Sequence, residues 1–222
     1  MCGRYTLTQS PEAIAQAFQV KQHHQDPKYN IAPTQMVEVV LHNPVRGDRE
    51  IEQLRWGLIP SWTKDPGIGA KLINARSETA AQKPAFRSAF KHRRCLVIAD
   101  GFYEWQLQNG KKQPFYFHLL DKKQFAFAGL WEQWESPQNQ KINSCTILTT
   151  TANELVQPIH ERMPVILQEQ DYDLWLDQKV FKPEDLQKIL KPYVSEAMTA
   201  YPVSTLVNNP KHNSQDCIMP LS

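Results

Sequence analysis

The middle of the chain carries a run of strand-like segments joined by short turns, and this run constrains the fold more than any other feature. Five segments rich in aromatic and β-branched residues follow one another: 94–99, 102–107, 114–120, 124–131 and 143–150. Two of them meet at Asn109 and Gly110, a pair typical of a tight β-hairpin. Upstream, the alternating segments 36–42 and 50–56 flank a longer turn. These connections predict a mainly antiparallel sheet.

Helices are expected in groups outside this run. One should begin at Ser10 and Pro11 and end near Val20, because Ser is a good N-cap and Pro fits the first turn. The other helical segments are 78–91, which is interrupted at Pro84, 171–177 and 183–190. Hairpins with grouped helices favour an α+β fold over regular βαβ alternation. We therefore expect a single domain, residues 1–222, with an antiparallel, barrel-like β core and flanking helices.

The composition excludes several classes of protein. Hydrophobic residues make up 41% and charged residues 22% of the chain, which provides enough apolar material for a packed core. The net charge of +2 excludes a histone-like polycation but leaves a local basic groove open. The sequence has no apolar run long enough to span a membrane and no secretory leader, so a cytoplasmic protein is expected.

The four cysteines are widely separated in the chain: Cys2, Cys95, Cys145 and Cys217. The sequence contains no Cys-x-x-Cys pair and no Cys/His spacing typical of metal ligands. A disulfide framework and a structural zinc site therefore both lack support, and we expect reduced thiols.

Cys2 is the most informative single residue. A small side chain at position 2 favours removal of Met1, which would leave an amine and a thiol on adjacent carbons. Both groups titrate close to neutrality in model compounds. An aldehyde can form an imine with such an amine, and the thiol then closes a five-membered thiazolidine ring. Taken alone, Cys2 is more simply explained as a small residue in a frayed terminus.

Two segments place cations near polar groups. Arg4 lies two residues after Cys2 and could hold an anion such as phosphate, although it could equally be a solvated surface charge. Asn74 and Arg76 lie two residues apart, so their side chains share a side if the segment is extended. Asn74 could bind a substrate or the terminal amine, but a lone Asn is more often a turn or cap residue.

Four further residues are candidates for chemistry or recognition. Glu104 lies among aromatic residues in a predicted strand, where burial would raise its pKa and suit it to proton transfer. His160 and Arg162 lie between prolines in a rigid loop, which supplies an acid–base group and an anion clamp. Trp62 could stack on a nucleobase. The plainer alternatives are a solvent-facing Glu, a structural His and a core Trp.

Taken together, these motifs closely resemble the SOS-response-associated peptidase (SRAP) family, the abasic-site processing proteins. The resemblance covers essentially the whole chain in order, which makes it far more specific than any one motif. The segments that carry it are 1–5, 29–34, 54–60, 73–79, 100–105, 159–164, 202–204 and 207–209.

The resemblance implies a DNA-damage response protein that recognises an abasic site in single-stranded DNA and traps it in a covalent DNA–protein crosslink. An open abasic deoxyribose presents an aldehyde at C1′, the electrophile that a terminal 1,2-aminothiol captures. No metal or other cofactor is needed. The resemblance leaves open whether strand scission, crosslink reversal or self-removal of Met1 accompanies capture. We expect a monomer that associates with the nucleoid when bound to DNA.

The family's functional residues carry over to positions that match in this sequence. Cys2 is the expected nucleophile, and Asn74 is expected to orient the terminus and the sugar. Glu104 is expected to shuttle protons during imine formation and ring closure, with His160 assisting at the sugar. The remaining candidates are expected to contact the DNA strand, by holding phosphates or stacking on a base: Arg4, Arg76, Arg162 and Trp62.

Two other functions remain open. An N-terminal-nucleophile hydrolase would use the Cys2 thiolate to attack an amide, and its only peptidase act could be removal of Met1. A plain single-strand-binding module would leave Cys2 incidental. The three arginines favour a DNA strand over a peptide, and a plain binding module does not explain Glu104 and His160.

Overall fold

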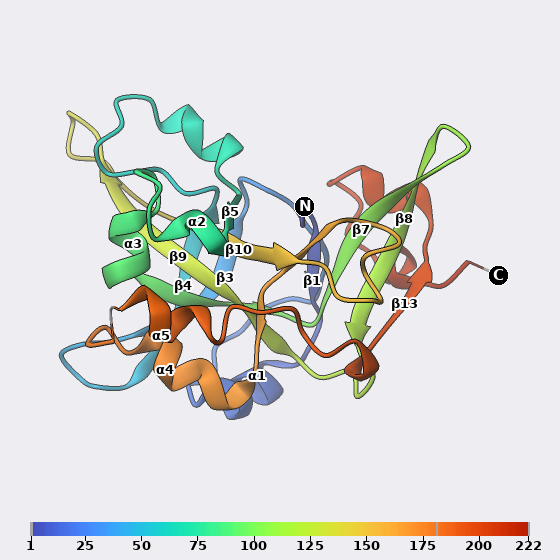
Figure 1. The fold of residues 1–222 in the computed structure, drawn as a ribbon, viewed down its shortest axis with the longest axis horizontal. Coiled ribbons are helices and arrows are strands. Elements are labelled where there is room, and N and C mark those ends of the chain that lie inside the picture. Colours follow the sequence, from blue (N-terminus) through green and yellow to red (C-terminus); the bar gives the residue numbers. More distant parts are fainter. Residues whose placement is uncertain (1, 181, 222) are drawn as a thin grey trace.

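The larger of two sheets contains a closed five-stranded barrel (Figure 1). The computed structural model describes residues 2–180 and 182–221. Around the barrel, each strand pairs with the next, and the last pairs with the first: β10 (Lys141–Thr151), β4 (Arg49–Trp56), β3 (Met36–His42), β6 (Arg94–Ala99) and β9 (Phe125–Glu135). Three short strands extend it: β5 (Asn74–Arg76), β11 (Arg162–Pro164) and β12 (Ile166–Leu167). Closure leaves no free edge among the five barrel strands.

The second sheet lies beside the barrel and contains the N-terminal strand. Its order is β13 (Met198–Pro202), β8 (Lys111–Leu119), β7 (Gly101–Gln108), β1 (Tyr5–Leu7) and β2 (Lys28–Ile31). Figure 1 shows β1 between the barrel and the protruding β7–β8 hairpin. At the tip of the hairpin, Asn109 and Gly110 both have positive φ (49° and 75°), which matches the expected tight turn.

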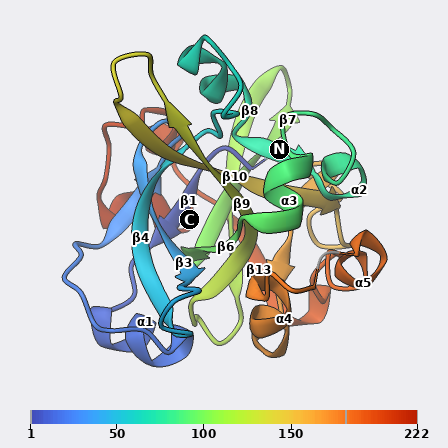
Figure 2. The ribbon, with the colours of Figure 1, turned by 90° about the vertical axis from the view of Figure 1, so that its left-hand side faces the viewer.

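Short helices flank the barrel (Figure 2). They are α1 (Pro11–Phe18), α2 (Ser77–Ala80), α3 (Arg87–His92), α4 (Tyr172–Leu176) and α5 (Pro183–Gln187). As expected, the Ser10 side chain caps α1 by accepting a hydrogen bond from the Ala13 amide, although the helix ends at Phe18, before Val20. Gln19 follows in the left-handed region with φ of 55°. Short 3-10 helices occupy 66–71, 169–171, 195–197, 205–208 and 215–218.

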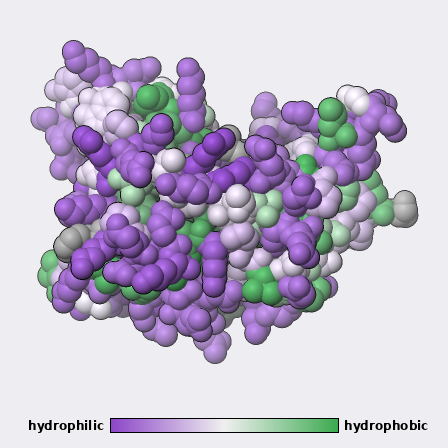
Figure 3. All heavy atoms as spheres, viewed as in Figure 1, coloured by the Kyte–Doolittle hydropathy of each residue, from purple (hydrophilic) through white to green (hydrophobic). Residues whose placement is uncertain are grey.

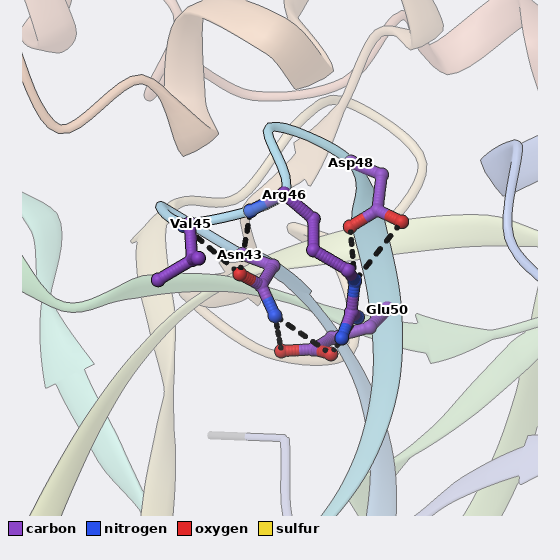
Figure 4. Close-up of polar contacts among 5 residues, drawn as sticks. All are labelled: Asn43, Val45, Arg46, Asp48 and Glu50. Atoms are coloured by element: carbon purple, nitrogen blue, oxygen red, sulfur yellow. Dashed lines mark hydrogen bonds and ion pairs between the residues drawn. The ribbon is translucent and has the colours of Figure 1, made fainter.

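The loop between β3 and β4 shows how the sequence builds a longer hairpin (Figure 4). The side-chain oxygen of Asn43 accepts hydrogen bonds from the amides of Val45 and Arg46 at 3.0 and 3.1 Å. The guanidinium of Arg46 then pairs with Asp48 and Glu50. These side-chain contacts add to two backbone hydrogen bonds of 2.8 Å that close the loop, from the Asn43 amide to the Asp48 carbonyl and from the Gly47 amide to the Asn43 carbonyl.

Aromatic side chains fill the space between the barrel and the second sheet. Tyr5 of β1 packs edge-on against Trp56 and Phe127, at 5.3 and 5.7 Å between ring centroids. Phe102 stacks on Phe117 at 4.9 Å. All five side chains are fully buried, so β1 is held in place by the core on which it lies. The outer face in Figure 3 is mainly hydrophilic.

The expected α+β class with a barrel-like core is confirmed, with two differences. β10 runs parallel to β4 and β5, and these two pairings were not predicted within the mainly antiparallel sheet that the sequence indicates. The shortest strands were not predicted from the sequence, because two to five residues are too few to show a clear hydrophobic period. They are β1, β2, β5, β11, β12 and β13. In the described part of the chain, no helix is long and apolar enough to span a membrane.

Candidate active site

Cys2 lies fully buried just before β1. Its thiol lies 3.7 Å from the carbonyl of Arg4, to which it donates, and its own carbonyl accepts a 2.8 Å hydrogen bond from Asn74 Nδ2. Burial raises the pKa of the Cys2 thiol well above its usual value, and the nearby carboxyl group of Glu104 raises it further. The thiol is therefore protonated near neutral pH and needs a base when it reacts.

Asn74 is held by β5, which pairs with β10 in register with Ile147. Residues 74–76 are extended, which is the condition under which the sequence places the side chains of Asn74 and Arg76 on one side. Asn74 Oδ1 is buried and has no hydrogen-bond partner among the described residues. One end of the amide therefore fixes the Cys2 carbonyl, and the other end can accept a hydrogen bond.

Glu104 projects from the middle of β7, where it pairs with Phe115 of β8 and is only 2% exposed. Burial raises the pKa of its carboxyl group, and the charge of His160 acts in the opposite direction. The sequence-based expectation for the direction of this shift agrees with the structure. A carboxyl group with a raised pKa can both give and take a proton at a pH closer to neutrality.

Glu104 and His160 line one cavity of about 440 Å³. The full lining is Gly3, Arg4, Glu104, Trp105, Lys112, His160 and Asn208. Gly3 and Arg4 directly follow Cys2, so the cavity opens beside the candidate nucleophile. The structure thus brings the start of the chain, β7 and the loop before β11 to one place.

The His160 ring is bound to the backbone of Arg162. Nδ1 lies 3.0 Å from both the amide nitrogen and the carbonyl oxygen of Arg162. A neutral ring accepts from the amide through Nδ1 and then carries its proton on Nε2, whereas a protonated ring donates to the carbonyl. His160 therefore has a backbone partner in either protonation state.

The three candidate arginines differ in their surroundings. Arg4 lines the cavity and donates to the Val207 carbonyl at 2.8 Å. Arg76 is exposed at the end of β5. Arg162 is 9% exposed, and its guanidinium forms a two-point ion pair with Glu78. This ion pair was not predicted from the sequence, which indicated that Arg162 would bind an anion such as phosphate.

Trp62 lies outside the cavity that Glu104 and His160 share. Its side chain is 63% exposed and borders a separate hollow of about 470 Å³ that Arg87 and Glu132 also line. An exposed indole is available for stacking. The expected core alternative for Trp62 is wrong.

Three cavity residues were missed from the sequence: Trp105, Lys112 and Asn208. Trp105 Nε1 donates to Asn208 Oδ1 at 2.7 Å. The tight turn at the hairpin tip sets the register of β7 and β8, so the position of Lys112 beside β7 could have been predicted. No local sequence pattern places Asn208 beside β7.

The carboxyl-terminal segment is anchored at the same place. The Asn30 side-chain amide lies 3.1, 3.0 and 2.9 Å from the carbonyls of Val207, Asn209 and His212. Together with the bond from Arg4 to Val207, these contacts hold one wall of the cavity. Among the described residues, no cluster of three or more His, Cys, Asp or Glu side chains could hold a metal ion.

Comparisons with known proteins identify the family of this chain. The sequence model of the family described as SOS response associated peptidase (SRAP) matches residues 1–210. Abasic site processing protein YoqW of Bacillus subtilis is 44% identical, over 98% of this chain and 99% of its own. Abasic site processing protein HMCES of Xenopus tropicalis is 32% identical, over 98% of this chain and 78% of its own.

Solved structures share the fold. A crystal structure of a Bacteroides thetaiotaomicron protein superimposes with a TM-score of 0.89 at 24% identity, covering all of both chains. One from Bordetella bronchiseptica gives 0.77 at 28% identity, covering 91% of this chain and 100% of its own. By sequence model and by its relatives, this chain belongs to the SRAP family.

Proposed function

We propose that this protein processes abasic sites by capturing them covalently in single-stranded DNA through Cys2. The observation that carries the proposal is the placement of buried Cys2, fixed by Asn74, beside a cavity lined by Glu104 and His160. The names of the relatives, abasic site processing proteins, support the substrate class. Capture requires loss of Met1, which lies outside the described residues, because only then is the Cys2 amine free.

The reaction joins the chain to the sugar with loss of one water. The Cys2 amine adds to the C1′ aldehyde, and the resulting hydroxyl leaves as water after taking a proton from Glu104. The loss of water leaves an iminium ion and the Glu104 carboxylate. The thiol sulfur then bonds to C1′ of the iminium ion, whose double-bond electron pair returns to nitrogen. The thiol proton passes to the Glu104 carboxylate, which restores the acid and completes the thiazolidine. The raised pKa of Glu104 suits both the donation and the return of the proton.

The raised thiol pKa also favours this chemistry over amide hydrolysis. A cysteine peptidase needs its thiolate as the attacking group, whereas burial keeps the Cys2 thiol protonated. In aldehyde capture the amine attacks first, and the thiol needs to lose its proton only during ring closure. The aldehyde itself provides specificity, because a nucleotide with an intact base presents no carbonyl at C1′.

The strand is held by phosphate contacts and stacking. Arg4, which lines the cavity, and exposed Arg76, two residues after Asn74, are the proposed phosphate ligands, whereas Arg162 is paired with Glu78. Trp62 stacks on a flanking base from its exposed position. Binding should therefore weaken as salt concentration rises and depend little on sequence.

The proposal is tested with protein shown by mass spectrometry to begin at Cys2. This protein is incubated with a single-stranded oligonucleotide carrying one abasic site and examined by denaturing electrophoresis and intact-mass analysis. The expected product has the mass of protein plus DNA less one water. Cys2→Ala and an oligonucleotide with an intact base should give no adduct. Failure of the unsubstituted protein to form the adduct would overturn the proposal.

A further inference from the structure

Glu78 forms a two-point ion pair with Arg162 near the candidate site. Arg162 Nη1 and Nη2 donate to the two carboxylate oxygens of Glu78 at 2.7 and 2.8 Å. Arg162 Nη2 also donates to the Thr149 carbonyl at 2.6 Å. The Arg162 guanidinium lowers the pKa of Glu78. A parallel two-point arrangement fixes the orientation of both groups as well as their separation.

The ion pair joins two segments that are far apart in the chain. Glu78 lies in α2, which directly follows β5 and therefore continues the segment that holds Asn74. Arg162 begins β11, and both β5 and β11 pair with β10 at Thr149. The ion pair thus connects the segments on the two sides of β10, the strand with which both β5 and β11 pair.

Each end of this connection leads to a group at the candidate site. On one side, Asn74 donates to the Cys2 carbonyl. On the other side, the amide of Arg162 donates to His160 Nδ1 at 3.0 Å. A shift of the Arg162 backbone would therefore move the imidazole, and a shift of the α2 segment would move the amide that holds Cys2. Glu78 itself does not line the cavity.

We propose that Glu78 is a positioning residue, which acts through Arg162 to hold the His160 ring in register with Cys2 and Asn74. This role rests on the proposed function, since it concerns the rate of abasic-site capture. A misplacement of about 1 Å at a reacting group is enough to slow a reaction up to about a hundredfold. Pairing also neutralises Arg162, so its main task is orientation rather than attraction of DNA.

Because Glu78 is negatively charged, its removal should affect DNA affinity and the rate of capture differently, and this distinguishes a positioning role from strand binding. Glu78→Gln removes a negative charge beside the site and leaves the Arg162 cation without its counter-ion. Affinity for DNA should therefore stay unchanged or become tighter. The rate of adduct formation should nevertheless fall, because the imidazole is less well held. A residue that acted only on DNA binding would not give this combination.

The experiment compares Glu78→Gln with Glu161→Gln, an exposed carboxylate next to His160 that undergoes the same chemical change. Single-turnover adduct formation is measured at saturating abasic DNA across a pH series. Affinity is measured separately with an oligonucleotide that carries a tetrahydrofuran abasic analogue, which has no aldehyde. We expect Glu78→Gln to slow capture about tenfold and to change its pH profile, with affinity equal or tighter. Glu161→Gln should behave as the unsubstituted protein.

Glu78→Asp provides a second variant, since it keeps the charge on a shorter side chain and should recover part of the lost rate. A full rate and an unchanged pH profile in Glu78→Gln would overturn the positioning role alone. A loss of affinity that accounts for the loss of rate would also overturn it. Absence of adduct with the unsubstituted protein would instead overturn the proposed function, and with it this role.

Discussion

Two buried carboxylates four residues apart, Asp100 and Glu104, have contrasting surroundings. Both are at most 4% exposed. Asp100 accepts hydrogen bonds from the hydroxyls of Thr6 and Thr8, at 2.5 and 2.7 Å, and from the amides of Thr8 and Gln9. Glu104 lines the cavity beside Cys2 instead, and burial raises its pKa. Burial alone therefore does not give a carboxylate its role, which depends on its hydrogen-bond donors and on its access to a cavity.

The largest effect is expected at Glu104. Glu104→Gln keeps the size of the side chain but removes its ability to carry a proton. We expect single-turnover adduct formation to slow by about 100- to 10,000-fold, the usual contribution of a general acid–base group. An unchanged rate would show that Glu104 does not transfer protons during capture.

The matching change at Asp100 should act on stability. Asp100→Asn replaces an acceptor oxygen by an NH₂ group that faces donors, which leaves buried donors unsatisfied. We expect a loss of about 2–3 kcal/mol in the free energy of unfolding, measured with urea. At temperatures where the variant is folded, adduct formation should proceed. If stability were unaffected, Asp100 would not be the anchor of the segment after β1.

The pH dependence of stability offers a subtler test. The pKa of Glu104 is raised in the folded state, so this group favours folding below the unfolded value of about 4.5. That contribution is lost as pH rises through the folded-state pKa. The stability of the unsubstituted protein relative to Glu104→Gln should therefore be greater at pH 4 than at pH 7. Urea unfolding of both proteins at the two pH values measures this, and a difference of the opposite sign would contradict a raised pKa.

The smallest effect is expected when a single donor to Asp100 is removed. Thr8→Val keeps the shape and the backbone amide but deletes one hydroxyl, so about 1 kcal/mol of stability should be lost. The rate of adduct formation should not change, because Thr8 does not line the cavity. A reduced rate without reduced stability would mean that Asp100 affects capture as well as stability, so the two carboxylates would not have separate roles.

The sequence predicted the elements whose signals are local. The strands at 94–99 and around Asn109, and the break at Pro84 between α2 and α3, agree with the structure because each depends on neighbouring residues. The closure of the barrel through the parallel pairing of β10 and β4 had no such signal. It depends on a contact between segments about 90 residues apart, which no local pattern encodes.

The site shows the same division. Cys2, Asn74, Glu104 and His160 were singled out as residue types in motifs. In the structure, Glu104 and His160 line one cavity, Cys2 directly precedes two of its lining residues, and Asn74 binds the Cys2 carbonyl. The partner of Arg162 could not be foreseen, because Glu78 lies 84 positions away and only the fold brings the two charges together. Chemistry-bearing residues can thus be recognised from sequence, whereas their supporting contacts require the structure.

The anchoring of the carboxyl-terminal segment has a consequence for the order in which the molecule is assembled. Arg4 and Val207 are bonded across 203 positions, so this wall of the cavity closes one of the longest loops in the chain. During synthesis, Asn208, next to Val207, follows all other residues that line the cavity. The cavity is therefore completed late in synthesis, after the barrel strands have been made, and a chain interrupted before residue 207 carries the nucleophile without its finished site.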